Sequence, residues 1–235
     1  MSAKRAKSSF PTPAEYWEGR YRAGGTSGAG SVGAMRAWKW SIIDRYVDAL
    51  DDVIDVGCGD LSFWEGRDCR RYVGLDLSKS VLRANRRRRP RWSFICADAA
   101  KPLRARAMIV LCMDVLFHVL DESQYSAILR NLSAYTDRWL FVGTWIRNPV
   151  APRWTHVRSA LPTRGCVASA ALLVAHPLQL FRSTMRRLSF GLHEQYHGPG
   201  ASFNVLLETG LRLVAVHPSP FDDGINALYV FHRKA

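Results

Sequence analysis

The sequence has no apolar run long enough to cross a bilayer as a helix. The longest run, residues 166–181, has 16 residues and is interrupted by His176, Pro177 and Gln179, whereas a membrane-spanning helix needs about 20 apolar residues. The first nine residues are basic and no apolar segment follows them, which argues against a secretory signal. These absences favour a cytoplasmic protein.

Cysteine is scarce and is not arranged for metal binding. The five cysteines lie at positions 58, 69, 96, 112 and 166, with no CxxC pair and no metal-ligand spacing to the seven histidines. An odd number of thiols, most of them in expected strands or turns, fits reduced cysteines better than a disulfide framework. The sequence therefore predicts neither a metal site nor structural disulfides.

Acidic residues are absent from a long stretch of the second half of the chain. From Arg138 to His193 inclusive there is no Asp or Glu, while eight arginines occur. Residues 166–187 combine an apolar middle with basic margins, a pattern that suits a peripheral membrane contact, an apolar acceptor pocket or a dimer contact. The interpretation that we favour is a helical lid or substrate insertion over residues 144–199, with basic ends that face solvent.

The formal net charge of +13 is a further imbalance, and it leaves two interpretations open. A basic surface can bind a polyanion such as RNA, or it can be a solvated, arginine-rich surface. The sharpest basic run, Arg86–Arg89 with Arg91, falls at the end of an expected helix, where cations interact favourably with the helix dipole. No RNA-binding module accompanies this run, which weakens the RNA interpretation.

What the sequence does have is an alternation of strands and helices. Strands are expected at residues 53–56, 72–75, 92–96, 108–113 and 139–142, and helices near Pro13 and at 35–50, 78–87 and 122–135. This order predicts a Rossmann-like, doubly wound α/β sheet in one domain, residues 13–235, behind a disordered tail at residues 1–12. A helix at 200–209 and strands at 211–217 and 225–232 complete the chain, and the last strand is expected to be antiparallel because a hairpin loop precedes it.

The most informative segment is Val53–Asp60, a buried strand that runs into a turn with glycines at 57 and 59. Asp55 lies in this segment, and Asp76 and Asp98 each follow another apolar run, at separations of 21 and 22 residues. Ligands of open α/β sheets bind at the carboxyl ends of the strands. Three acids along that edge are typical of a nucleoside-binding arrangement.

From these residues the chain resembles the class I S-adenosylmethionine-dependent methyltransferases. The resemblance implies that Gly57, Cys58 and Gly59 wrap the methionine part of S-adenosylmethionine and that Asp55 lies near its amino group. It further implies that Asp76 accepts from both ribose hydroxyls and Asp98 from the adenine amino group. Leu75, Leu77 and Cys96 are expected to wall the adenine, and the remaining cofactor contacts are expected from Ala99 and Met113.

The glycine turn departs from the family pattern at one position and also has a rival interpretation. Many family members have a third glycine where this chain has Leu61. The run from Gly57 to Ser62 also approximates the dinucleotide-binding fingerprint of dehydrogenases. That fingerprint requires neither Asp55 nor Asp98, so the two acids favour the methyltransferase interpretation.

The N-terminal segment Tyr16-Trp17-Glu18-Gly19-Arg20-Tyr21, with the glycine- and serine-rich loop behind it, resembles the head of a bacterial subgroup of these enzymes. The resemblance implies an element that closes over the cofactor. Arg20 would pair with the methionine carboxylate, and Tyr16 or Trp17 would cover the sulfonium through cation–π attraction. The alternative is a packing helix with a solvated arginine.

Candidate catalytic residues follow the fourth expected strand. Asp114 stands at its end, and His118 follows one helical turn later, where it can take a proton from a hydroxyl acceptor. The alternative for His118 is a structural role. Tyr196 and His197 are rival substrate contacts, unless they belong to a plain surface loop.

The sequence thus predicts an S-adenosylmethionine-dependent methyltransferase that acts on oxygen or nitrogen of a small-molecule or saccharide-like acceptor. Two alternatives remain open. One is an RNA methyltransferase that uses its basic surface, and the other is a non-catalytic binding protein on the same fold.

Overall fold

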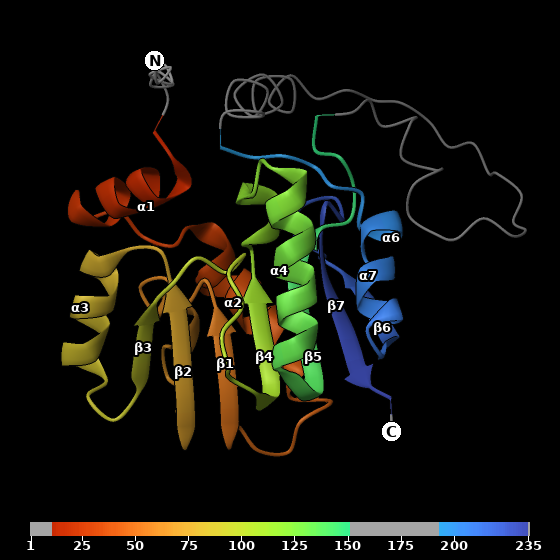
Figure 1. Cartoon of the computed structure of the whole chain (residues 1–235), viewed down its shortest axis with the longest axis horizontal. Coiled ribbons are helices and arrows are strands. Elements are labelled where there is room, and N and C mark those ends of the chain that lie inside the picture. The colour runs from red at the N-terminus through yellow and green to blue at the C-terminus, as the bar shows by residue number, and fades with distance from the viewer. Residues whose placement is uncertain (1–10, 151–192, 235) are drawn as a thin grey trace, which may run out of the picture.

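The computed structural model describes residues 11–150 and 193–234. A seven-stranded sheet runs through these residues in the order β3-β2-β1-β4-β5-β7-β6 (Figure 1). Its strands are β1 (Asp52–Val56), β2 (Arg71–Asp76), β3 (Ser93–Cys96), β4 (Ala107–Met113), β5 (Thr136–Trp145), β6 (Leu211–Pro218) and β7 (Asn226–Arg233). The helices are α1 (Pro13–Arg22), α2 (Gly33–Ile43), α3 (Lys79–Arg88), α4 (Glu122–Tyr135), α6 (Pro199–Ser202) and α7 (Asn204–Glu208), with 3₁₀ turns η1 (Ala29–Ser31), η2 (Ser62–Trp64) and η3 (Leu116–His118).

The strand pairing confirms the predicted sheet. Strands β1 to β5 pair in parallel with their neighbours, and β7 lies antiparallel between β5 and β6. The chain runs outward from β1 to β3 and then crosses to β4 on the other side of β1, so the strand order reverses between β1 and β4. In open α/β sheets ligands bind at such a reversal, at the carboxyl ends of the strands.

Two apolar clusters cover the two faces of the sheet. Helices α4 and α7 pack on one face, and α2 and the η2 turn pack on the other (Figure 1). Side-chain alternation sends Ile54 and Val56 to the α4 face and Val53 to the α2 face. The central strand β4 is buried except at Met108, in keeping with its continuous apolar run. Each large apolar side chain that is fully buried stabilises the fold by about 1.5–3 kcal/mol.

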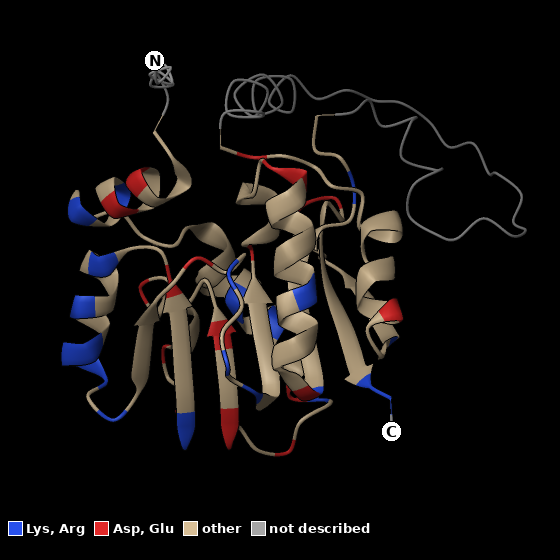
Figure 2. Ribbon diagram, viewed as in Figure 1, with Lys and Arg blue, Asp and Glu red and all other residues tan. Residues whose placement is uncertain are grey.

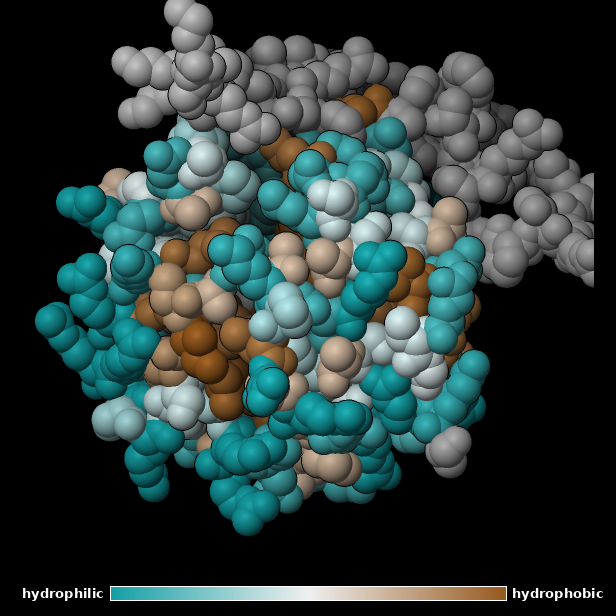
Figure 3. Space-filling model, viewed as in Figure 1, coloured by the Kyte–Doolittle hydropathy of each residue, from teal (hydrophilic) through white to brown (hydrophobic). Residues whose placement is uncertain are grey.

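The connection from β3 to β4 contains no helix, because residues 97–106 form turns and irregular backbone. The α4 face of the sheet is therefore thinly covered at this edge. Ile95, which pairs with Leu75 of the α4-side cluster, is 38% exposed. Figure 3 shows apolar side chains gathered on the surface in front of these strands.

The starts of three helices follow from capping residues. Thr12 and Glu15 form a reciprocal capping box at the start of α1. Ser78 accepts the Val81 N–H at the start of α3, and Asp121 accepts the Gln124 N–H at the start of α4. Such a cap contributes about 1 kcal/mol, and the three helices begin within a residue of where the sequence predicts them.

Two predicted helices differ from those observed. The helix expected at 35–50 ends at Ile43, because the Tyr46 hydroxyl bonds to His217 Nε2 at 2.9 Å and its ring packs against Trp139. The helix expected at 200–209 is divided at Phe203 into α6 and α7. The Phe203 ring packs against Tyr229 and Phe231 of β7, so in both places contacts with the sheet accompany the departure from the helical pattern.

The predicted insertion begins inside the sheet, because Thr144 and Trp145 are the last residues of β5. Most of the lid expected at 144–199, together with the membrane contact expected at 166–187, lies outside the described residues. So does most of the tail expected at 1–12, although Thr12 is ordered by its capping role. None of the helices in the described ranges is long and apolar enough to span a bilayer.

The basic run at the end of α3 is partly accounted for by contacts within the fold (Figure 2). Arg86 donates to the Phe94 carbonyl, and Arg88 donates to the Asp60 carbonyl. The Arg89 guanidinium lies 4.6 Å from the centre of the Trp92 ring, a cation–π contact. These arginines tie the end of α3 to β3 and to the neighbouring loops, which gives the run a structural role.

Candidate functional site

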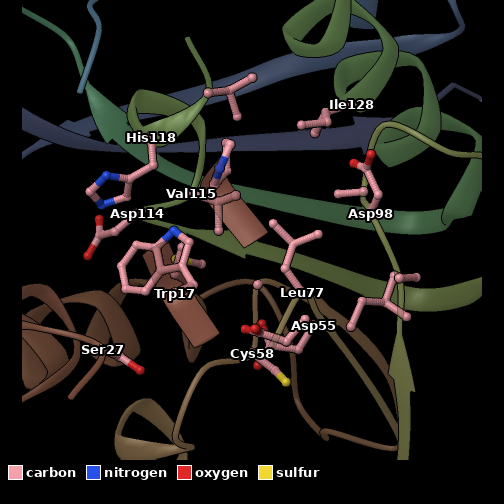
Figure 4. Close-up of a pocket in the computed structure, with 18 of the residues that line it drawn as sticks. Trp17, Ser27, Asp55, Cys58, Leu77, Asp98, Asp114, Val115, His118 and Ile128 are labelled. Atoms are coloured by element: carbon pink, nitrogen blue, oxygen red, sulfur yellow. The ribbon is translucent and has the colours of Figure 1, made fainter. Parts of the chain in front are cut away.

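A cavity lies at the carboxyl ends of β1, β2 and β4, beneath α1. It encloses about 1010 Å³ of empty space, counted with the solvent at its open mouth. Asp55, Asp76 and Asp98 all line it. Figure 4 shows His118, Asp114 and Trp17 together at one end of the cavity and Asp98 at the other, with Asp55 and Cys58 between them.

Other lining residues come from every segment that meets the cavity. Of the predicted residues, the lining includes Trp17, Gly57, Cys58, Leu75, Leu77, Ala99, Met113, Asp114 and His118, whereas Cys96 does not line the cavity. The lining residues that the sequence analysis did not select are Pro13, Tyr21, Ser27, Ser31, Phe63, Ala97, Val115, Val119, Gln124 and Ile128.

The glycine turn is built for close approach of the chain to itself as well as to a ligand. Gly57 and Gly59 have φ of +77° and +51°, which glycine adopts without steric cost. A Cβ at Gly57 would overlap the Val115 side chain, and a Cβ at Gly59 would overlap Ser27 Oγ. Gly59 itself does not line the cavity, so its main steric role is to admit the N-terminal loop.

Leu61, at the position of the missing third glycine, adopts the left-handed conformation with a φ of 61°. That conformation costs about 1–2 kcal/mol for a residue with a Cβ. The side chain is only 3% exposed in the α2-side cluster. Burial of leucine therefore offsets the backbone strain, and the turn keeps its shape without the third glycine.

Asp55 is held from within the core. Its Oδ2 accepts from Trp64 Nε1 at 2.7 Å and from the Tyr72 hydroxyl at 2.8 Å. The residue is 3% exposed, and burial raises the pKa of its carboxyl to about 6, against the opposing effect of the two hydrogen bonds. Both donors anchor the carboxylate to the α2 side of the sheet.

Asp76 and Asp98 are positioned by backbone N–H groups. Asp76 accepts from Gly59 at 3.0 Å through Oδ2 and from Ser78 at 2.9 Å through Oδ1. Burial raises the pKa of Asp76 above its ordinary value. Asp98 accepts from the Ala100 N–H at 2.9 Å. Each carboxylate oxygen can accept more than one hydrogen bond, so both groups can still receive donors from a ligand.

The N-terminal segment covers the glycine turn. Trp17 and Tyr21 of α1 line the cavity, and the Tyr21 hydroxyl bonds to Ser27 Oγ at 3.1 Å. Ser27 in turn donates to Asp60 Oδ1 at 2.7 Å and accepts the Asp60 N–H. Glu18 accepts from Ser78 and from the Ser80 N–H, which fastens α1 to the start of α3.

Two of the cofactor contacts expected in the head, Arg20 and Tyr16, lie outside the cavity lining. Arg20 donates through Nε to the Thr26 carbonyl at 2.7 Å and lies 5.8 Å from the Trp17 ring centre. Tyr16 stacks on His193, with ring centres 4.3 Å apart. The pairing of Arg20 with a methionine carboxylate would require its side chain to leave this position.

Asp114 follows β4 in the left-handed conformation, with a φ of 59°, which is uncommon for a residue other than glycine. Its Oδ2 pairs with Lys39 Nζ at 2.5 Å, and Lys39 also donates to the Gly30 carbonyl at 2.9 Å. Lys39 is 1% exposed, and lysine is seldom buried so fully unless it is paired. The ion pair joins α2, the N-terminal loop and the end of β4.

His118 lies on η3 with its ring edge-on to Trp17, at 5.0 Å between ring centres. Its Nδ1 lies 3.0 Å from the His193 carbonyl oxygen. A carbonyl oxygen only accepts, so Nδ1 carries the proton and Nε2 keeps its lone pair. Burial lowers the pKa of His118, so the ring is neutral at neutral pH.

Known proteins resemble this chain in both sequence and structure. Residues 53–137 match the family described as a methyltransferase domain. Magnesium protoporphyrin IX methyltransferase from Synechocystis, solved with bound S-adenosylhomocysteine, superposes with a TM-score of 0.61 at 17% identity, over 94% of this chain and 98% of that chain. The N-methyltransferase NodS from Bradyrhizobium japonicum, in complex with S-adenosylhomocysteine, superposes with a TM-score of 0.56 at 15% identity, over 86% of this chain and 88% of that chain.

The fold is that of the class I methyltransferases. The glycopeptide N-methyltransferase MtfA, complexed with S-adenosylmethionine, shares it with a TM-score of 0.54 at 15% identity, over 85% of this chain and 94% of that chain. No curated protein matches the chain in sequence.

In this methyltransferase fold Tyr196 and His197 brace the cavity from outside its lining. The Tyr196 hydroxyl donates to the Ile146 carbonyl at 3.0 Å. The His197 ring stacks on Tyr125 at 3.8 Å and bonds to Glu122 and to the Val119 carbonyl. The Tyr196 bond secures the chain after residue 192 to the end of β5, and the His197 contacts secure it to α4 and to the residue after η3. The substrate contact expected for these two residues stays a prediction.

The sequence analysis missed Lys39, although the pattern held a signal for it. Lys39 precedes Ile42 and Ile43 by three and four residues, so it shares the apolar stripe of α2. A lysine on a buried helical stripe needs a carboxylate partner, and Asp114 supplies it.

Within the described ranges, no group of three or more His, Cys, Asp or Glu side chains is arranged to hold a metal ion.

Proposed function

We propose that the chain is an S-adenosylmethionine-dependent methyltransferase and that its cavity binds the cofactor and the acceptor together. The observation that carries the proposal is the meeting of three strand-end carboxylates, Asp55, Asp76 and Asp98, in one cavity. The methyltransferase-domain match over residues 53–137 supports it, as do the S-adenosylhomocysteine and S-adenosylmethionine bound in the structural neighbours.

The lining fits an adenosyl ligand. Asp76, at the end of β2, is the partner that we assign to the ribose hydroxyls, since a carboxylate accepts two hydrogen bonds at once. Asp98, at the far end of the cavity in Figure 4, is assigned to the adenine amino group. Leu77, Ala99 and Ile128 supply apolar surface for the ring. The turn at Gly57 then faces the amino-acid part of the cofactor.

The cofactor, when bound, supplies a methyl group that is already activated for in-line displacement. The chain's own contribution is alignment, together with removal of a proton from acceptors that keep one. His118 is suited to that removal, because its Nδ1 is committed to the His193 carbonyl and its Nε2 is a free base at neutral pH. Trp17, edge-on to His118, limits the acceptor's position at this end.

The acceptor that we propose is a small molecule or a saccharide-like metabolite, methylated on oxygen or nitrogen. Two structural neighbours are named for acceptors of limited size, magnesium protoporphyrin IX and a glycopeptide. The RNA alternative receives less support, because Arg86, Arg88 and Arg89 make contacts within the fold.

Calorimetric titration with S-adenosylhomocysteine tests the cofactor assignment. Asp76→Ala should weaken binding by at least tenfold, since each hydrogen bond to a charged group is worth about 1.5–3 kcal/mol. Asp68→Ala, which removes a carboxylate 68% exposed and outside the cavity, is the matched control and should bind like the wild type. Absence of binding to the wild type would favour the non-catalytic alternative.

The acceptor class is tested by transfer of a labelled methyl group to fractionated cell extract. Label should enter the small-molecule pool in the presence of the wild type and should fall with Asp76→Ala. Label that enters only RNA, with a steep dependence on salt, would replace the acceptor class proposed here.

A further inference from the structure

Four carboxylates line the cavity in the described part of the chain, and they differ in how their oxygens are used. Asp55 accepts two core donors on one oxygen, and Asp76 accepts a backbone N–H on each. Asp98 accepts the Ala100 N–H. Asp114 is different, because its Oδ1 is buried and has no hydrogen-bond partner among the described residues.

The other carboxylate oxygen of Asp114, Oδ2, is held in place by an ion pair and by close packing against Gly30. Oδ2 pairs with Lys39 Nζ at 2.5 Å, and a Cβ at Gly30 would overlap that same oxygen. The backbone of Asp114 is held in the left-handed conformation by the bond from its N–H to the Gly143 carbonyl at 2.9 Å. Strained backbone and buried charge of this kind concentrate at functional sites.

A buried carboxylate oxygen without a partner, on a residue that lines the cavity, can be satisfied by a hydrogen-bond donor of the ligand. The best match is a cation, because charge-assisted hydrogen bonds are about twice as strong as neutral ones. Asp114 stands where the N-terminal loop meets the glycine turn. Ser31, beside Gly30, lines the cavity there, and the side chain of Val115 packs against Gly57. This is the side of the cavity that we assigned to the amino-acid part of the cofactor.

We propose that Asp114 Oδ1 accepts a hydrogen bond from the α-ammonium group of the cofactor and that Lys39 is the positioning residue that aims this oxygen. The inference rests on the proposed function and sharpens it. It moves the ammonium contact from Asp55, whose Oδ2 serves the core donors Trp64 and Tyr72, to Asp114.

Two ligands isolate this contact in a calorimetric titration. S-adenosylhomocysteine carries the ammonium group, and 5′-methylthioadenosine shares the adenosine and the sulfur but lacks the amino-acid part. Asp114→Asn should weaken binding of the first by tenfold or more and leave binding of the second unchanged. The Asn amide oxygen must turn to Lys39, so its NH₂ group would face the ammonium as a second donor.

Four further variants complete the comparison. Lys39→Met, which removes the ion-pair partner, should also lose the preference for S-adenosylhomocysteine. Asp55→Asn should keep the wild-type ratio of the two affinities, and Asp76→Ala should weaken both ligands. Asparagine tolerates the left-handed conformation, and Asp114→Gly, which adopts it freely, serves as a second variant. Circular dichroism verifies that each variant is folded.

The outcomes separate the two levels of the argument. Wild-type protein that binds neither ligand overturns the proposed function itself. Wild-type binding with an unchanged affinity ratio in Asp114→Asn overturns the ammonium contact alone, as does a loss of the ratio in Asp55→Asn. Equal weakening of both ligands by Asp114→Asn also contradicts it, because the residue would then support the cavity as a whole. An unchanged ratio in Lys39→Met removes the positioning role of Lys39.

Discussion

Replacement of Asp55 by asparagine should change the free energy of unfolding by an amount that depends on pH. Burial raises the pKa of Asp55 from 3.8 to about 6 in the folded protein. The folded state therefore holds the proton more tightly than the unfolded state, so this group's stabilisation is complete at low pH and is lost as pH rises through the folded pKa. The raised pKa lowers the free energy of unfolding by about 2–3 kcal/mol between about pH 4 and about pH 8.

The Asp55→Asn variant has no carboxyl group at this position, so its free energy of unfolding does not fall for this reason as pH rises. Its amide oxygen can accept from Trp64 and Tyr72 as the carboxylate does, while the NH₂ group takes the side that faces the cavity. We expect the variant to be more stable than the wild type at about pH 8 and to lose that advantage at about pH 4, by the same 2–3 kcal/mol or so. Urea unfolding at both pH values measures the difference, and other titrating groups cancel in the comparison.

Tyr72→Phe is the matched control, because it removes one donor to the carboxylate and keeps the ring. Loss of this hydrogen bond should make Asp55 harder to ionise, so Tyr72→Phe should be destabilised more at high pH than at low pH. The reasoning is wrong if Asp55→Asn changes the unfolding free energy equally at both pH values, since a buried carboxyl with a raised pKa must give a difference.

Three other predictions concern the turn, the N-terminal loop and the proposed base. Leu61→Gly should be at least as stable as Leu61→Ala in urea unfolding, the reverse of the usual order, because both lose the buried side chain but glycine relieves about 1 kcal/mol or more of left-handed strain. Gly30→Ala should lower the melting temperature and the affinity for S-adenosylhomocysteine, since its Cβ would displace Asp114, whereas Gly19→Ala, with open space around it, should be neutral or slightly stabilising. His118→Gln should reduce the rate of methyl transfer with little change in the affinity for S-adenosylhomocysteine. Because burial lowers the pKa of His118, the activity of the wild type should not change with pH above the ordinary histidine pKa. A wild-type activity that keeps rising at higher pH would contradict the assignment of His118 as the base.

Local patterns in the sequence were sufficient for the sheet and for one edge of the cavity. The run Val53–Val56 predicted a strand from its burial-prone residues alone, and the strand ends brought Asp55, Asp76 and Asp98 to the same edge. This follows because parallel neighbours present their carboxyl ends together. The starts of α1, α3 and α4 could also be predicted from the sequence, because a capping side chain bonds to a backbone N–H only two or three residues further along the chain.

Tertiary structure alone decided which polar groups face one another across the cavity. Lys39 and Asp114 are 75 residues apart, and neither periodicity nor capping carries information over that distance. Tertiary contacts also placed Arg20 on the Thr26 carbonyl and set His197 against Tyr125. The positions and ends of the strands follow from short-range patterns, whereas the order of the strands in the sheet and the direction of a side chain in a loop depend on what the rest of the fold packs beside them.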